Sequence, residues 1–94
     1  MTIRNDNASD ITITQISYRL TGTANYTVWP NKKGAPGVPY LLTAGSSWVP
    51  VLGVLAAPCK KPIEVKIDYT INGAATYEVD EITNVQRLVT VKQN

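Results

Sequence analysis

The sequence predicts an all-β protein, a small antiparallel β-sandwich of about seven strands. Val, Ile and Thr make up 29 of the 94 residues, and their β-branched side chains favour extended backbone. Strand-like runs alternate with Gly, Pro and Asn turn residues at intervals of about 8–12 residues, as in sandwiches and barrels. No stretch shows apolar residues recurring at helical spacing. We expect an immunoglobulin-like or related Greek-key topology, with a small β-barrel as the alternative.

The expected strands are the runs of alternating apolar residues between these turn signals. The clearest is residues 63–71, where Ile, Val and Tyr alternate with Glu, Lys, Asp and Thr. In residues 48–55 both faces are apolar, but Pro50 confines the run to an edge or a bulge. The full set is residues 3–5, 11–20, 25–29, 40–42, 48–55, 63–71, 75–80 and 85–91.

No repeat, low-complexity tract or linker divides the chain, so we expect one domain over residues 1–94. Cys59 is the only cysteine, so no internal disulfide can form and the fold must rest on packing. Lys60 and Lys61 follow it, and cations can lower a thiol pKa. We interpret Cys59 as an ordinary loop residue, because reactive cysteines also need a base or a helix N-terminus.

The run over residues 11–20 changes phase. Ile11 and Ile13 have one parity, whereas Ile16 and Tyr18 have the other. Either a β-bulge near Thr14 and Gln15 or a strand that crosses between sheets would produce this pattern.

The segment around Asn72-Gly73 is a hairpin whose register can be argued. Asn-Gly usually signals a two-residue type I′ loop, but that register sets Ile67 opposite Glu78. A three-residue loop with Gly73 in a G1 bulge sets Ile67 opposite Tyr77 instead. Because burial of one face should outweigh the turn preference, we expect the bulged loop.

The predicted core is Ile13, Tyr18, Val65, Ile67, Tyr69, Tyr77, Val79 and Val89.

The residue inventory argues against an enzyme. Histidine is absent, which removes the usual general base and the commonest metal ligand. No G-x-S-x-G elbow occurs, and the Ser, Thr and Cys side chains have no imidazole to activate them. Glu78, Asp80 and Glu81 lie on a predicted hairpin and are interpreted as a solvated face rather than a cleft. We therefore predict no catalytic residues and no cofactor.

The turn Asn5–Asp10 contains the one cluster of oxygen donors that could hold calcium. It lacks the order of an EF-hand loop and the distal Glu. Asn and Asp are common in turns because their side chains cap local backbone. We therefore predict no metal site.

Net charge and hydropathy exclude further classes of function. The net charge is +2, too small for the clustered cations of a nucleic-acid surface. The longest apolar stretch, residues 48–58, is too short to span a bilayer. No signal peptide is visible, so the compartment stays open between the cytosol, export without a Sec signal and a processed start. Asn7 and Asn25 begin N-glycosylation sequons, which matter only in a eukaryotic secretory setting.

Aromatic and basic residues around the long connection 30–39 form the candidate binding site. Rigid aromatic side chains near loops supply binding area at little entropic cost. The alternative is that both tryptophans plug the ends of the core. The predicted binding residues are Trp29, Lys32, Lys33, Tyr40 and Trp48.

These observations predict a non-catalytic interaction or structural module. It would bind protein partners or self-associate through sheet edges and the 30–39 loop. The alternative is a lectin-like module in which the loop aromatics bind a carbohydrate or a lipid headgroup.

Overall fold

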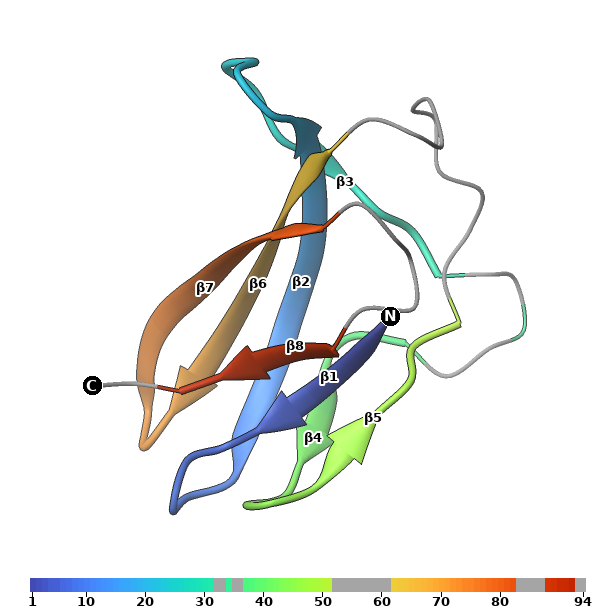
Figure 1. Ribbon diagram of the computed structural model, residues 1–94. Coiled ribbons are helices and arrows are strands. Elements are labelled where there is room, and N and C mark those ends of the chain that lie inside the picture. Colours follow the sequence, from blue (N-terminus) through green and yellow to red (C-terminus); the bar gives the residue numbers. More distant parts are fainter. Residues whose placement is uncertain (32–33, 35–36, 52–61, 83–87, 93–94) are drawn as a thin grey trace.

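The computed structural model describes residues 1–31, 34, 37–51, 62–82 and 88–92, which form eight strands and no helix (Figure 1). The all-β prediction is therefore confirmed. The strands are β1 (Thr2–Asn5), β2 (Ile11–Leu20), β3 (Thr27–Val28), β4 (Tyr40–Leu42), β5 (Ser47–Trp48), β6 (Ile63–Ile71), β7 (Ala74–Ile82) and β8 (Leu88–Val91).

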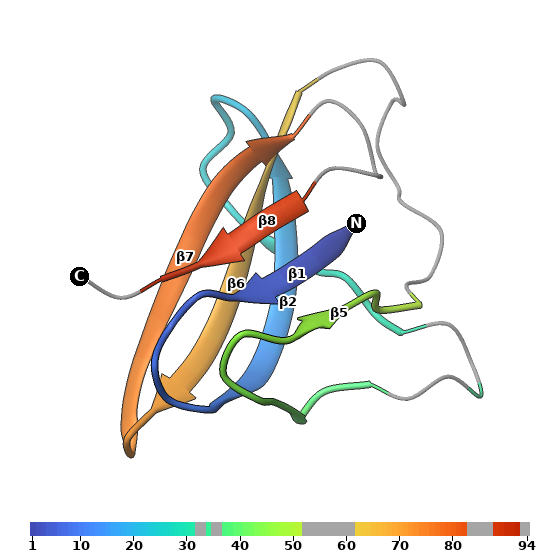
Figure 2. The ribbon, with the colours of Figure 1, turned by 60° about the horizontal axis from the view of Figure 1, so that its bottom comes forward.

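The strands form two packed sheets, so the sandwich is confirmed and the barrel is not. The larger sheet has the order β3-β2-β6-β7, with β4 also paired with β2, and all its pairs are antiparallel. The smaller sheet has the order β5-β1-β8, in which β1 and β8 are parallel. Figure 2 shows the smaller sheet lying across one face of the larger one. The immunoglobulin-like topology is not confirmed. In the immunoglobulin fold the last two strands of the chain share a sheet, whereas here β7 and β8 lie in different sheets.

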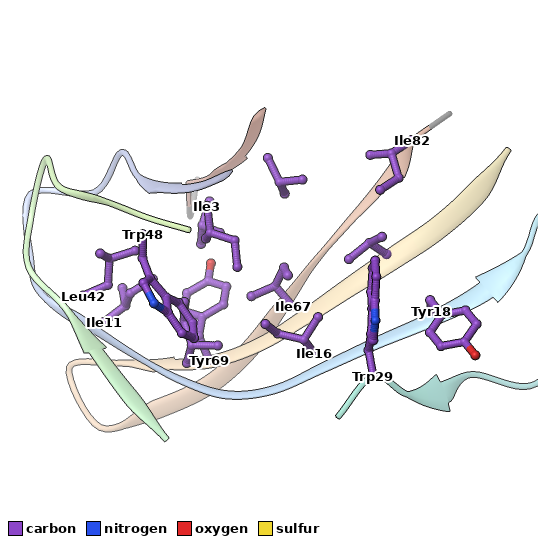
Figure 3. Packing of buried hydrophobic residues seen from close by; sticks show 14 of the residues in the cluster. Ile3, Ile11, Ile16, Tyr18, Trp29, Leu42, Trp48, Ile67, Tyr69 and Ile82 are labelled. Carbon is purple, nitrogen blue, oxygen red and sulfur yellow. The ribbon is translucent and has the colours of Figure 1, made fainter. Parts of the chain in front are cut away.

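The core lies between the sheets and follows from alternation along the strands (Figure 3). Every second residue of β6 is buried, because successive side chains of a strand point to opposite faces. Six of the eight predicted core residues are buried: Ile13, Tyr18, Val65, Ile67, Tyr69 and Val89.

The change of phase in β2 is a β-bulge. The register between β2 and β6 shifts between Ile13 and Gln15, and β2 pairs with β6 on both sides of the shift. The extra residue brings Ile11, Ile13 and Ile16 onto the same buried face in spite of their different parity.

The expected register of the β6–β7 hairpin is wrong. The strands are joined by the two-residue loop Asn72-Gly73, whose residues have φ values of 51° and 81°. Both lie in the left-handed region, as a type I′ turn requires. Ile67 therefore lies opposite Glu78. Because β6 is the one described strand that pairs with β7, Thr76, Glu78 and Asp80 of its inner row are half-buried. Placing Glu78 there therefore costs less than in a central strand.

The register also corrects two members of the predicted core. Tyr77 is 59% exposed and Val79 39% exposed, since both point away from the smaller sheet. In the middle of β7 the outer face thus carries Tyr77 and Val79, and the inner face carries Glu78 and Asp80.

The segment predicted as a strand over 48–55 is described as far as Val51. Within residues 47–51 the pairing covers Ser47–Trp48, at the edge of the smaller sheet, which agrees with the restriction set by Pro50. Val49 and Val51 are exposed, so the segment is not buried on both faces. Residues 52–61, including Cys59, and residues 83–87 lie outside the described residues.

Candidate functional site

Both tryptophans of the predicted binding site lie in the core (Figure 3). Trp29 is 6% exposed and packs edge-on against Tyr18, with ring centroids 5.5 Å apart. Trp48 is 9% exposed and stacks on Tyr40 at 3.9 Å. Their rings are covered by the protein's own side chains, which is the alternative that the sequence left open.

The other predicted binding residues give no assembled site. Tyr40 is half-buried, and its stacking on Trp48 uses one of its ring faces. Lys32 and Lys33 lie outside the described residues. A binding role for this end of the sandwich stays a prediction.

The Asn5–Asp10 turn uses its polar side chains to hold the fold together. Asn5 is 0% exposed, and its Nδ2 donates hydrogen bonds to the carbonyl oxygens of Ser9 and Leu42, each at 3.0 Å. Its Oδ1 accepts from the backbone N–H and the Nδ2 of Asn7, each at 3.0 Å. Asp10 Oδ1 accepts from the N–H of Ala44 at 2.9 Å. Among the described residues, no three His, Cys, Asp or Glu side chains are grouped as metal ligands.

The clearest unsatisfied surface is the outer edge of β7. This strand is nine residues long and lies at the end of the larger sheet, with β6 as its one paired strand among the described elements (Figure 2). A long edge strand presents a row of unpaired N–H and C=O groups to a further strand.

The register identifies which backbone groups face that edge. A two-residue hairpin loop is closed by a hydrogen-bonded pair, here Ile71 and Ala74, and such pairs alternate along antiparallel strands. The 3.4 Å hydrogen bond from Thr21 N to Pro62 O agrees with this alternation. Pro62 directly precedes β6, and its carbonyl points toward the β2 side, as those of the even-numbered residues of β6 should. The free N–H and C=O groups of β7 therefore belong to Ala75, Tyr77, Val79 and Glu81.

The inner row of β7 is acidic. Glu78 is half-buried opposite Ile67 and forms no hydrogen bond or ion pair with any described residue. Burial and the nearby charge of Asp80 raise the pKa of Glu78 above its ordinary value. Burial, and then the charge of Glu78, raise the pKa of Tyr69, which shares this inner face. A negative charge at Glu78 is therefore unfavourable in the free protein.

We expect Glu78→Gln to stabilise the protein at neutral pH by about 0.5–1 kcal/mol. This is the usual size of the effect when an unfavourable charge at a half-buried position is removed. A raised carboxyl pKa lowers the stability of the wild type as the pH rises from about 4.5 upward. The charge of Asp80 contributes to the raised pKa of Glu78, so Asp80→Asn is the control: it removes the repulsion between the two carboxylates and leaves Glu78 in place. Tyr69, whose pKa is raised by the charge of Glu78, is unchanged in both variants. Urea unfolding of both variants from pH 3.5 to 8 measures the difference. A Glu78→Gln protein less stable than the wild type at pH 8 contradicts the assignment.

The outer face beside this edge carries a connected polar cluster. Arg19 donates from Nε and Nη2 to Oε2 of Glu64, at 2.9 and 2.7 Å, and Tyr26 Oη donates to the same oxygen at 3.1 Å. The bonds from Arg19, ahead of the one from Tyr26, lower the pKa of Glu64. Lys66 Nζ lies 4.8 Å from the Tyr77 ring centroid. The cations of this cluster are thus engaged by the chain's own carboxylate and rings.

The sequence predicted binding through sheet edges but did not identify β7 as the strand at such an edge. The available signal was Asn72-Gly73 itself. Read as a type I′ loop, it places Glu78 on the inner face and Tyr77 on the outer face.

No protein-family model, curated protein or solved structure matches this chain. Within the described residues, no helix is long and apolar enough to cross a bilayer.

Proposed function

We propose that this protein is a non-catalytic interaction module that binds an extended segment of a protein partner along the free edge of β7. The observation that carries the proposal is the outer edge of a nine-residue strand, which pairs with no described strand. Two exposed apolar side chains, Tyr77 and Val79, lie beside the backbone groups of that edge. In such β-augmentation the main chain supplies hydrogen bonds and alternate side chains supply specificity.

The inventory of reactive groups supports a binding role over a catalytic one. The sequence contains no histidine, and the Arg19, Glu64 and Tyr26 cluster is internally hydrogen-bonded. A lectin-like function is a weaker candidate, because the tryptophans that would stack on a sugar are buried.

A proline at Val79 tests the proposal, because it removes an N–H that faces the outer edge of β7. It leaves the hydrogen bonds between β6 and β7 intact. Edge strands accept proline where the N–H faces solvent. We expect Val79→Pro to fold and to bind a capped nine-residue peptide of alternating Val and Thr at least about tenfold more weakly, since one bond and the close approach are lost. Glu78→Pro is the matched control: it removes a bond to β6 and should reduce stability much more.

Amide hydrogen exchange gives the direct readout. In the free protein the N–H groups of Tyr77 and Val79 should exchange fast, whereas those of Glu78 and Asp80 should be protected. Addition of the peptide should protect Tyr77 and Val79. Their protection in the free monomer, or equal peptide binding by the wild type and Val79→Pro, contradicts the proposal.

A further inference from the structure

The charge of β7 is unlike that of the rest of the chain. Three of the seven acidic residues of the protein, Glu78, Asp80 and Glu81, lie in this strand, and no basic residue does. The chain as a whole carries a net charge of +2. The free edge is therefore a local acidic strip on a weakly basic protein.

The strip has an ordered pattern across the two faces of the sheet. Glu78 and Asp80 belong to the inner row, whereas Tyr77 and Val79 belong to the outer row. Lys66 lies opposite Val79 on the outer face, where its ammonium contacts the Tyr77 ring. Glu81, at the end of the strand, also belongs to the outer row and accepts a hydrogen bond from Thr21 Oγ1. A strand added along residues 77–80 would thus meet carboxylates on the inner face and apolar side chains on the outer face.

From this pattern we infer that the partner segment alternates basic and apolar residues, with a Lys or Arg placed beside Glu78 on the inner face. The inference rests on the proposed function of the β7 edge. Directly opposed side chains of neighbouring strands share a face, and opposite charges there are stabilising. Glu78 is half-buried without an ion pair to any described residue, so a cation next to it compensates a charge that is unfavourable in the free protein.

A second copy of β7 fits this edge less well. The free backbone groups belong to odd-numbered residues, so an antiparallel second copy must pair odd with odd residues. A two-fold axis at Glu78 sets that residue opposite itself, and an axis at Val79 sets Glu78 opposite Asp80. An axis at Tyr77 sets Glu78 opposite Thr76, but the two Glu78 side chains then become diagonal neighbours. Like charges in these positions are destabilising.

Three capped nine-residue peptides test the inference, with Val at alternate positions and Lys, Thr or Glu at the intervening ones. We expect the Lys peptide to bind about fivefold more tightly than the Thr peptide at low salt, the ratio typical of one favourable ion pair, and the Glu peptide to bind most weakly. The preference should shrink as salt is raised, because screening weakens partly exposed pairs. Glu78→Gln should still bind the Thr peptide and should lose most of the Lys preference. Lys66→Gln, a change of charge on the other face, is the control and should keep it.

The outcomes separate the inference from the proposed function. If the Lys and Thr peptides bind equally and Val79→Pro weakens both, the edge binds extended segments but the basic specificity is wrong. If none of the three binds, the proposed function fails and the inference fails with it. If sedimentation shows a wild-type dimer at neutral pH that Val79→Pro dissociates, the occupant is a second copy, and the inference is overturned.

Discussion

Replacing Ile67 with Ala lowers the free energy of unfolding by about 2–4 kcal/mol, the usual cost of truncating a buried aliphatic side chain. Ile67 is 0% exposed and lies in the middle of β6, between Ile16 of β2 and Glu78 of β7. Its side chain points into the space between the sheets, so its truncation leaves a cavity that rigid strand backbones cannot close. Urea unfolding at neutral pH measures the change.

Val79→Ala is the control for this experiment, and it also tests the hairpin register. In the observed register Val79 faces solvent, so its truncation should cost less than about 1 kcal/mol. In a bulged register Val79 would point into the core, opposite Val65. Its truncation would then cost as much as that of a buried residue. Two large losses would show that the register is wrong, and a loss below about 0.5 kcal/mol at Ile67 would show that β6 is inverted.

The parts of the fold that followed from the sequence are those in which one local pattern decides the structure. In β6 the alternation of apolar and polar residues is unbroken, and its predicted limits, 63–71, are those observed. In β2 the sequence revealed the change of phase and left a β-bulge and a strand that crosses between sheets open. The pairing of β2 with β6 on both sides of the shift decides for the bulge.

The hairpin register was not predictable from pattern alone, because it depends on whether β7 lies at an edge. A central strand could not have placed Glu78 on its inner face, and the apolar match with Tyr77 would then have prevailed. Strand order depends on long-range pairing, and nothing within residues 63–82 reveals that β6 is the one described strand that pairs with β7. The turn preference of Asn72-Gly73 was the more reliable local signal.

The sequence could not decide where the two tryptophans lie, since aromatic side chains serve cores and surfaces alike. Trp29 directly precedes a loop in the sequence, yet its ring packs on Tyr18 within the sandwich. Large rings fill space that shorter side chains leave at the ends of a small core. The exposed aromatic next to the proposed site is Tyr77, which its apolar alternation had assigned to the core.

Asn5→Asp, the smallest possible change at a buried polar position, is expected to destabilise the protein by at least about 3 kcal/mol at neutral pH. The variant carboxylate can still accept the bonds from Asn7. It cannot donate to the carbonyl oxygens of Ser9 and Leu42, and it places a negative charge beside them. The bond to Ser9 holds the first turn, and the bond to Leu42 joins the end of β1 to β4, so its loss weakens a contact between the two sheets.

The pH dependence of this variant identifies the cause. Burial beside two carbonyl oxygens raises the pKa of the new carboxyl group in the folded state above its unfolded value of about 3.9. The deficit relative to the wild type should therefore be smallest below about pH 3.9, where the group is protonated in both states. It should grow as the pH rises and level off above the folded-state pKa. Asn25→Asp, at an exposed position, should leave the free energy of unfolding within about 0.5 kcal/mol of the wild type throughout. A deficit that is the same at pH 3 and pH 7 would mean that a negative charge beside the carbonyl oxygens of Ser9 and Leu42 does not cause the loss of stability.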